Sequence, residues 1–268
     1  MNAETTKLFP IQSPQESQVK GINNRLLLAL PRTILDRILR ISEPVSLARG
    51  QRLYHTDQPL NHLYFINRGL ACIFKTMEDG RTVEIEAIGI DDIVDALFLI
   101  GSDRAILDTV VQIPGTALRV RREDLMNEIE KDKALRQFMQ RYARHVCNRV
   151  TRTVACHRLH HLEQRCCHWL LMAHDSALSD EFPLTHEFLA MMLGYQRAGV
   201  SIIMRSLVDA GVIAHKRGKV SILDRTRLEA MACECYRTTK SDADELYAAA
   251  PKFAQVFEFK QTDKSRAR

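Results

Sequence analysis

The sequence of 268 residues predicts an α+β protein with three parts: a β-sandwich or roll, a long helix, and a helix-turn-helix followed by a basic hairpin. Three patterns predict these parts. Short apolar segments punctuated by glycines fill residues 44–120, apolar positions at three-and-four spacing run through residues 122–157, and two short amphipathic helices flank a glycine within residues 184–210. A hydrophobic content of 46% with 26% charged residues is typical of a globular protein.

The first part begins after a polar segment, residues 1–20, which we expect to be disordered. Apolar residues at helical spacing between residues 24 and 39 predict two short helices, because Pro31 interrupts them. The dipeptide Asp79-Gly80 is a hairpin signal between the apolar segments 72–76 and 82–88. Many short strands at regular spacing favour a β-sandwich or roll.

The long helix carries an apolar seam that one small domain cannot hide fully, with a break expected near Asp132. Arginines flank this seam from residue 134 onward. We therefore expect the seam to pack against the same helix of a second copy, as in a coiled coil. The candidate dimer-interface residues are Phe138, Tyr142, Val146, Val150 and Val154.

The helix-turn-helix pattern begins at Thr185, a plausible N-cap, and is broken by Gly194. A second helix, about residues 196–210, presents Arg197, Ser201 and Arg205 on one face, which we expect to be exposed. The residues that we expect this helix to bury are Val200, Ile203, Met204, Leu207 and Val208. This arrangement would leave the N-terminal turn of the second helix free to enter a major groove.

A hairpin is expected over residues 212–223, with Lys216, Arg217 and Lys219 at its tip. Between residues 196 and 219 there are five basic residues and one acidic residue, although the whole chain carries a formal charge of only +5. Such a local charge suits phosphate groups and would give salt-dependent affinity for DNA. A basic surface that is merely solvated is the alternative interpretation.

Several exact strings, together with the order of the parts, resemble the Crp/Fnr superfamily of bacterial transcription regulators. In the roll they are Gly50-Gln51-Arg52-Leu53, Leu63-Tyr64-Phe65-Ile66 and Arg68-Gly69, and in the C-terminal part they are the helix-turn-helix itself and Ile222-Leu223-Asp224-Arg225. The resemblance covers roughly residues 24–236. It implies an N-terminal β-roll, which is a jelly roll of the cyclic-nucleotide-binding type, then a dimerisation helix and a C-terminal winged helix-turn-helix.

The resemblance also implies a function and a division into domains. Family members regulate transcription as cytoplasmic homodimers on palindromic double-stranded DNA operators, with RNA polymerase as a candidate further partner. The expected divisions are a disordered N-terminus (1–20), a β-roll sensor domain (21–121), a dimerisation helix (122–158), a winged helix-turn-helix domain (159–236) and a C-terminal extension (237–268).

Carried over position by position, Arg197 matches the family's base-reading arginine, and Thr185 and Arg205 match positions near the phosphate backbone. Ala198, Gly199 and Ile202 depart from the best-known family pattern, so we expect a different operator sequence. The predicted DNA-binding residues are Thr185, His186, Gln196, Arg197, Ala198, Gly199, Ser201, Arg205, Lys216, Arg217 and Lys219.

The effector pocket of family members that bind a cyclic nucleotide uses a Gly-Glu pair and a later arginine. Here Asp95 and Ala96 stand in place of that pair, and Arg104 is shifted from the position of the arginine. A carboxylate beside a phosphate is repulsive, so we expect no cyclic-nucleotide binding and leave the small-molecule effector unknown. The candidate pocket residues are Asp95, Ala96, Arg104 and Thr151.

The seven cysteines are expected to be reduced, because the sequence shows neither an export signal nor a membrane span. An Fnr-type iron-sulfur cluster is not expected, since no cysteine precedes Cys72. For the cysteines and histidines in and after the long helix we expect ordinary packing, with a metal or redox role as the alternative, and Cys233-Glu234-Cys235 is interpreted as structural. The residues of that first group are Cys147, Cys156, His157, His160, His161, Cys166, Cys167 and His168.

No cofactor, metal or enzymatic activity is predicted. His186-Glu187 begins like a zinc-protease motif, but Ala190 occupies the place of the second histidine. The alternative function is a DNA-binding regulator that is effector-independent or responsive to thiol oxidation or metal, with a vestigial pocket. A protein-binding module that uses the long helix is a further alternative, and it predicts no salt-dependent DNA affinity.

Overall fold

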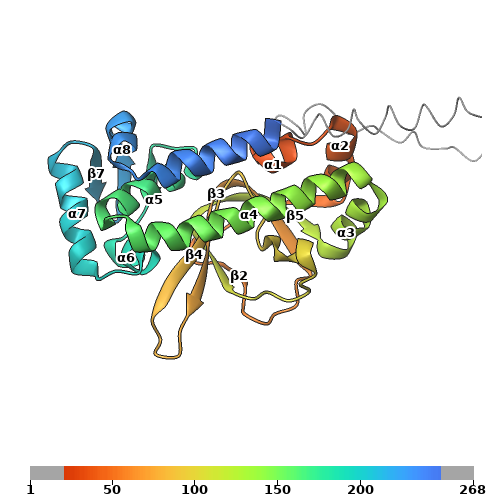
Figure 1. Ribbon diagram of the computed structural model, residues 1–268, viewed down its shortest axis with the longest axis horizontal. Helices are drawn as coiled ribbons and strands as arrows, with labels where there is room; N and C mark the ends of the chain where they lie inside the picture. Colours follow the sequence, from red (N-terminus) through yellow and green to blue (C-terminus); the bar gives the residue numbers. More distant parts are fainter. Residues whose placement is uncertain (1–20, 249–268) are drawn as a thin grey trace, which may run out of the picture.

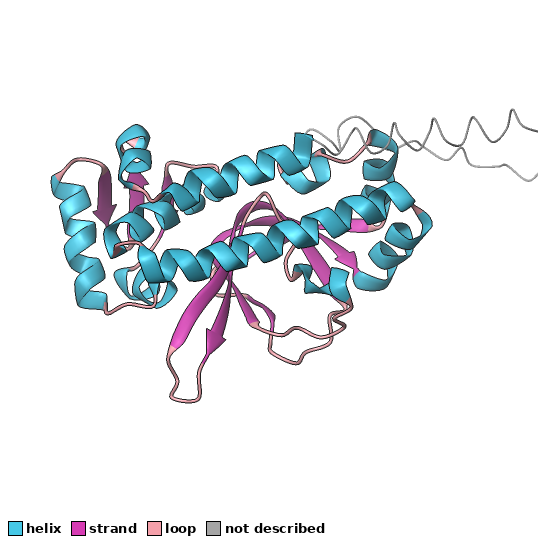
Figure 2. Cartoon of the chain, in the orientation of Figure 1, coloured by secondary structure: helices cyan, strands magenta, loops and turns pink. Residues whose placement is uncertain are grey.

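A computed structural model describes residues 21–248 of the chain, so the disorder predicted for residues 1–20 lies outside the described residues. The predicted α+β class is confirmed (Figures 1 and 2). The N-terminal sheet is antiparallel, with the strand order β1-β5-β3-β4 and with β2 paired to β5. Its strands are β1 (Ser42–Leu47), β2 (Arg52–Tyr54), β3 (His62–Thr76), β4 (Thr82–Ile88) and β5 (Asp108–Arg121).

The two longest strands, β3 and β5, are bent where their register shifts. Gly69 lies in this region with φ of 95°, and a Cβ atom on it would lie 2.5 Å from the carbonyl oxygen of Ile113. Only glycine tolerates both this backbone angle and this close approach. The bend lets the sheet curl around a core that contains Phe65, Ile66 and Phe98.

Two short helices precede the roll along the chain, and a long helix with a break near Asp132 follows it, as the sequence predicts. Pro31 separates the first two helices, and Asp132 caps the long one by accepting hydrogen bonds from the amides of Ala134 and Leu135, both at 3.0 Å. The chain therefore turns at Asp132, and the long helix that follows runs along the roll (Figure 1). The elements are α1 (Arg25–Leu28), α2 (Arg32–Arg40), the 3₁₀ helix η2 (Ala96–Ile100), α3 (Arg122–Lys131) and α4 (Lys133–Leu159).

The apolar seam of α4 faces the chain's own roll. Phe138, Tyr142 and Val146 are all buried within the core of the roll, and Val150 is half-buried. The expectation that the first three side chains face a second copy is therefore corrected, because a core contact within the chain already covers them. Of the five predicted interface residues, only Val154 is largely exposed, at 69%.

The C-terminal part forms a winged helix around its own apolar cluster, which includes Leu170, Leu189, Val200 and Leu207. The helix that follows the hairpin ends at Met231, because the backbone at Ala232 is extended. The elements are α5 (Leu162–Ala177), β6 (Glu181–Pro183), α6 (His186–Leu193), α7 (Arg197–Asp209), β7 (Ile213–Lys216), β8 (Lys219–Ile222) and α8 (Arg225–Met231).

A further helix, from residue 234 to residue 248, was not expected from the sequence. It runs back alongside α4 toward the roll, where Ala243 and Tyr247 are buried in the core of the roll (Figure 1). Arg152 of α4 pairs with Asp242 at 2.6 Å, and Tyr247 donates a hydrogen bond to the carbonyl of Asp91. This C-terminal helix thus ties the winged helix to the N-terminal domain.

The roll and the winged helix also touch directly. Leu70, Cys72 and Ile113 of the roll belong to the same apolar cluster as the winged-helix core. At the junction a Cβ atom on Gly89 would lie 2.0 Å from Ser176 Oγ, so only glycine allows this approach. In the part of the chain that the structure describes, no helix combines the length and the apolar character that crossing a membrane requires.

Candidate DNA-binding site

The first helix of the motif, α6, is fixed at both ends. The Thr185 hydroxyl accepts a hydrogen bond from the amide of Phe188 at 3.2 Å, which is the N-cap that the sequence predicts. Gly194 ends the helix in the left-handed conformation with φ of 59°. Leu189, Met192 and Leu193 face the core. These caps set the short turn that aims α7.

The second helix, α7, packs by one side and leaves its first turn in solvent. Gln196, Arg197 and Ala198 are exposed, whereas Gly199 is half-buried. The helix buries Val200, Met204 and Leu207, but Ile203 is only half-buried and Val208 is exposed, which corrects the expectation for these two residues. The buried stripe is therefore narrower than the sequence pattern suggested, and more of the helix surface is free.

The basic side chains of α7 are available to an external anion. Among the described residues, neither Arg197 nor Arg205 forms an ion pair, and both are exposed. A free guanidinium can make two parallel hydrogen bonds to guanine or to a phosphate. The geometry of α7 thus fits a helix that contacts nucleic acid.

A histidine pair connects α6, α7 and the wing. His186 of α6 stacks on His215 of β7 with ring centroids 4.5 Å apart, and its Nδ1 lies 3.0 Å from Ser201 Oγ on α7. Burial, with further contributions from His215 and Arg197, lowers the pKa of His186. The neutral ring that results adds no repulsion between the two helices. Three predicted contact residues, His186, Ser201 and Arg197, are thereby brought to one surface.

The wing is a tight hairpin of β7 and β8. Arg217 and Gly218 at its tip both have positive φ, 51° and 73°, as a two-residue hairpin turn requires. Lys216 and Arg217 are exposed, and within residues 21–248 neither forms an ion pair. Lys219 differs from them, because it pairs with the exposed Glu181 at 2.6 Å. The tip thus offers two free cations and one that is already neutralised.

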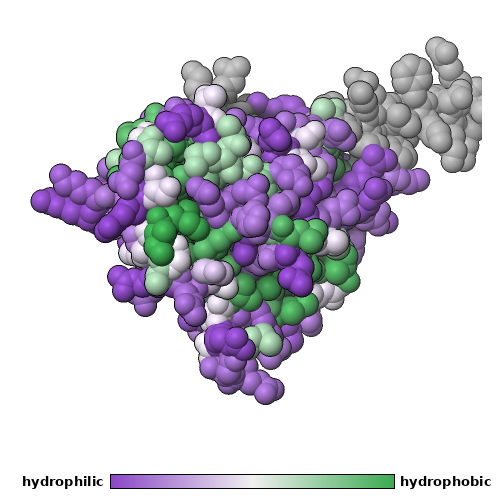
Figure 3. Space-filling view, turned by 60° about the vertical axis from the view of Figure 1, so that its left-hand side comes forward, coloured by the Kyte–Doolittle hydropathy of each residue, from purple (hydrophilic) through white to green (hydrophobic). Residues whose placement is uncertain are grey.

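One exposed aromatic residue of this surface, Tyr195, is not among the DNA-binding residues predicted from the sequence. Tyr195, in the turn before α7, is 55% exposed. A Cβ atom on Gly199 would lie 2.6 Å from Cε1 of this ring, so the glycine makes room for the tyrosine. A glycine within a helical segment indicates that another group packs closely against the helix, so Gly199 was the sequence feature that could have pointed to this contact. With the winged-helix end turned forward, Figure 3 shows mainly hydrophilic surface on the protruding parts.

A second candidate site is a cavity of about 340 Å³ between the roll and α4. Asp95 and Ala96 line it, as the sequence predicts, together with Glu86, Val146 and Val150. Burial raises the pKa of Asp95 to about 6. The cavity is apolar apart from its two carboxyl groups, which suits a neutral or cationic ligand better than an anionic one.

The other two predicted pocket residues lie elsewhere. The side chain of Arg104 is exposed and does not line the cavity. Thr151 is exposed on α4 and donates its hydroxyl to the carbonyl of Cys147 at 2.9 Å. Neither residue can therefore compensate a phosphate in this cavity.

Comparisons with known proteins agree with this geometry. A model of the cyclic nucleotide-binding domain matches residues 44–132, and a model of the Crp-like helix-turn-helix domain matches residues 164–231. Together they cover more than half of the chain. The chain belongs to the Crp/Fnr family. It is a DNA-binding transcription regulator.

Solved structures show the same fold. FixK2 from Bradyrhizobium japonicum shares 18% identity with a TM-score of 0.57, covering 72% of this chain and 98% of its own. A CRP-family transcriptional regulator from Thermus thermophilus shares 20% identity with a TM-score of 0.54, covering 70% and 96%. The c-di-GMP-responsive global regulator CLP from Xanthomonas campestris shares 16% identity with a TM-score of 0.55, covering 72% and 99%. A search of curated proteins found no match.

The cysteines of this Crp/Fnr regulator fall into distinct environments. Cys166 and Cys167 are buried in the winged-helix core, where burial raises the pKa of Cys167 to about 12. Such thiols are inert toward oxidants at neutral pH. Cys233 precedes the C-terminal helix, and the sulfur atoms of Cys233 and Cys235 lie beside Cys156 and His160. Long-range folding therefore joins residues whose grouping the local pattern does not show.

Proposed function

We propose that this regulator binds a palindromic operator as a homodimer, with the first turn of α7 in the major groove of each half-site. The observation that carries the proposal is the free, exposed Arg197 at the start of a helix whose opposite side is fully packed. Arg205 and the cations of the wing lie in the same domain and suit the phosphates on either side of the groove. The His186–Ser201 contact supports the orientation of α7.

The second copy would pack on the face of α4 that this chain leaves uncovered. Exposed residues recur on that face at alternating spacings of three and four, which is the period of a two-helix seam. They are Arg144, Cys147, Thr151, Val154 and Arg158. A two-fold axis along this seam would set the two copies of α7 about one helical turn of DNA apart.

The roll would act as the sensor through α4. Val146, Cys147 and Val150 line the cavity from α4, and Cys147 is also exposed on the uncovered face. A ligand that fills the cavity would therefore push on the helix that holds the two copies together. The chemical nature of the cavity favours an uncharged or cationic small molecule over a phosphate. RNA polymerase is the candidate protein partner at a promoter.

Binding to an operator selected from random duplexes tests the proposal. We expect Arg197→Ala to weaken operator binding by about 1–3 kcal/mol and to relax base choice at one position. Lys216→Ala or Arg217→Ala should weaken binding to operator and random DNA alike and lower the salt slope by about one. Lys219→Ala should do less, because Glu181 already neutralises Lys219. Fluorescence anisotropy at several salt concentrations measures all four variants.

Arg237→Ala is the matched control, since Arg237 is exposed on the C-terminal helix, outside the predicted DNA-binding residues. It should bind the operator like the parent protein. If Arg197→Ala lost affinity for operator and random duplexes equally, the assignment of Arg197 to base reading would be wrong. Sedimentation of the protein–operator complex checks for two chains per palindrome.

A further inference from the structure

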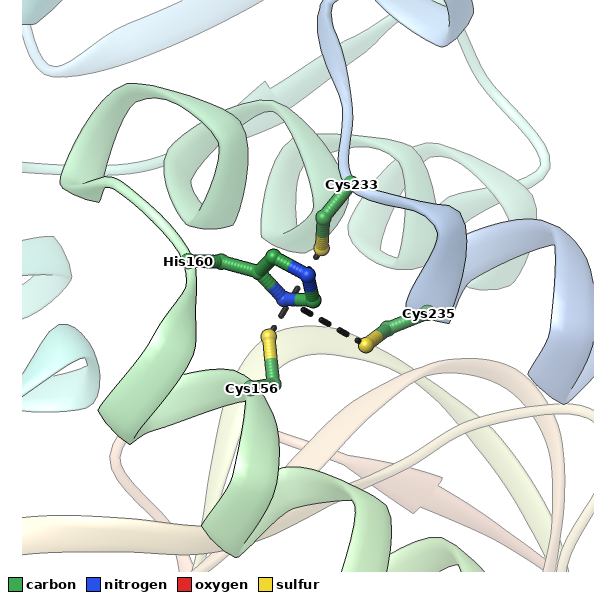
Figure 4. A group of neighbouring side chains, drawn as sticks. All are labelled: Cys156, His160, Cys233 and Cys235. Atoms are coloured by element: carbon green, nitrogen blue, oxygen red, sulfur yellow. Dashed lines mark hydrogen bonds between the residues drawn. The ribbon is translucent and has the colours of Figure 1, made fainter.

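Four potential metal ligands converge at the point where α4 ends and the C-terminal helix begins. Cys156 lies in the last turn of α4, His160 is the residue that follows this helix, and Cys233 and Cys235 come from the segment after α8. Their ligand atoms all lie within 4.8 Å of one another. Figure 4 shows the four side chains pointing toward a common centre. The two halves of this group are separated by more than 70 residues of sequence.

Two distances between the ligand atoms match those of a tetrahedral zinc site. Around a zinc ion with Zn–S bonds of about 2.3 Å, sulfur atoms lie about 3.8 Å apart, and a sulfur and a nitrogen lie about 3.6 Å apart. The Sγ atoms of Cys156 and Cys233 are 3.6 Å apart, and Cys235 Sγ lies 3.6 Å from His160 Nδ1. The ligands therefore need little rearrangement to coordinate an ion.

The surroundings support the same assignment. His160 Nε2 lies 3.1 Å from Glu234 Oε1, so a carboxylate can hold the ring with its Nδ1 turned toward the sulfur atoms. Metal-binding histidines characteristically have such a partner. His168 Nδ1 lies 3.7 Å from Cys233 Sγ and can donate to a thiolate, and the buried Arg165 lies in the same pocket. Three thiolates around a divalent ion leave one negative charge, which Arg165 offsets.

Other interpretations explain fewer of these features. A disulfide between Cys156 and Cys233 would require their sulfur atoms to close from 3.6 Å to about 2.05 Å, and it would leave the His160–Glu234 pair and Cys235 without a role. Simple thiol packing does not account for a histidine turned toward three cysteines. Three sulfur ligands and one imidazole exclude hard ions such as Mg²⁺ and Ca²⁺ and favour zinc.

We propose that Cys156, His160, Cys233 and Cys235 bind one Zn²⁺ ion in a closed, structural site. Four protein ligands leave no open position for a substrate. The three thiols bind as thiolates and release their protons to the solvent. The ion would join the end of α4 to the start of the C-terminal helix, which in turn contacts the roll through Asp242 and Tyr247. It would thus fix the hinge between the dimerisation helix and the DNA-binding domain.

Metal analysis of the full-length protein, purified without chelator, is the direct test. We expect about one zinc per chain in the parent protein and in Cys147→Ser, a control that removes an exposed thiol of the same helix. Cys156→Ser, Cys235→Ser and His160→Gln should each lose most of the zinc. Their far-UV circular dichroism and elution volume show whether they are folded.

A second measurement uses the parent protein, so it does not depend on whether the variants fold. Replacing zinc by Co²⁺ in the parent protein should give the intense visible bands of tetrahedral cobalt and a near-ultraviolet thiolate-to-cobalt band. Chelation should speed proteolysis after residue 231 and leave the roll intact. Absence of zinc with a Cys156–Cys233 disulfide in mass spectrometry, an iron chromophore, or full zinc content in Cys235→Ser would each overturn the proposal.

Discussion

The side chain of Arg149 lies at the centre of a buried cluster of charged residues between α4 and the roll. Its guanidinium contacts Glu86 Oε1 at 2.6 Å and both carboxylate oxygens of Asp92 at 2.8 and 3.0 Å. Tyr142 adds a hydrogen bond to Asp92 at 2.9 Å, and all four side chains are buried. Because two carboxylates share one cation, the cluster is stable only while the arginine is present.

We expect Arg149→Met to lower the free energy of unfolding by about 3–5 kcal/mol, because it leaves two buried carboxylates without a counter-charge. Urea denaturation monitored by circular dichroism measures this change. The control is Arg136→Met, which removes an exposed arginine of the same helix outside the proposed dimer face and should change stability by less than about 0.5 kcal/mol. Equal effects of the two substitutions would contradict the role of Arg149 as the counter-charge that stabilises the cluster.

Element by element, the cavity beside α4 differs from a cyclic-nucleotide pocket in charge. Its lining includes the carboxyl groups of Glu86 and Asp95 and, among the described residues, no lysine or arginine. Burial raises the pKa of Asp95 to about 6, so this group is still mainly ionised at pH 7.5. Glu86 is already paired with Arg149, so the repulsion comes from Asp95, and the cavity lining offers a cyclic phosphate no cation to offset it.

We therefore expect no saturable heat when the full-length protein is titrated with cAMP or cGMP at pH 7.5 up to millimolar ligand. Isothermal calorimetry measures this directly, and melting temperatures with and without ligand give an independent reading. Micromolar binding of either nucleotide would contradict the electrostatic argument. A ligand that binds in this cavity should instead lose affinity in Val150→Trp, which fills the space between α4 and the roll.

The sequence pattern predicts where helices and turns begin and end better than it predicts which elements pack against one another. The caps of α6, the break at Asp132 and the hairpin tip at Arg217-Gly218 follow from local chemistry and are found where expected. The seam of α4 was assigned to the wrong partner, because periodicity reveals an apolar face but not what covers it. The C-terminal helix was missed since only a thin apolar stripe, with Ala243 and Tyr247, marks it.

The same limit explains the cysteine cluster. Cys156 and His160 at the end of α4 belong to the cysteines and histidines for which ordinary packing was expected and a metal or redox role was the alternative. Cys233 and Cys235 join them only because the chain after α8 returns to the end of α4. A contact between distant segments depends on the whole fold, which the local pattern of one sequence does not specify.

For the molecule as a whole, the joint between roll and winged helix contains a buried acid. Glu84 of β4 accepts a hydrogen bond from the indole Nε1 of Trp169 on α5 at 3.1 Å. Burial raises the pKa of Glu84 from 4.5 to about 7. The joint therefore favours the protonated form of this side chain, and ionisation weakens the contact between the two domains.

This shift predicts a pH dependence of stability with a definite sign. Between about pH 4.5 and pH 7 the folded protein keeps a proton on Glu84 that the unfolded chain has lost, so the free energy of unfolding falls as the pH rises through this window. The contribution is up to about 3 kcal/mol. Glu84→Gln keeps an oxygen that can accept from Trp169 but cannot ionise, so its stability should fall less between pH 5 and pH 7.5 than that of the parent protein. Glu78→Gln, an exposed acid in the β3–β4 hairpin, should keep the parental slope. Urea denaturation of the three proteins at both pH values measures the difference, and an unchanged slope in Glu84→Gln would show that Glu84 does not titrate within the joint.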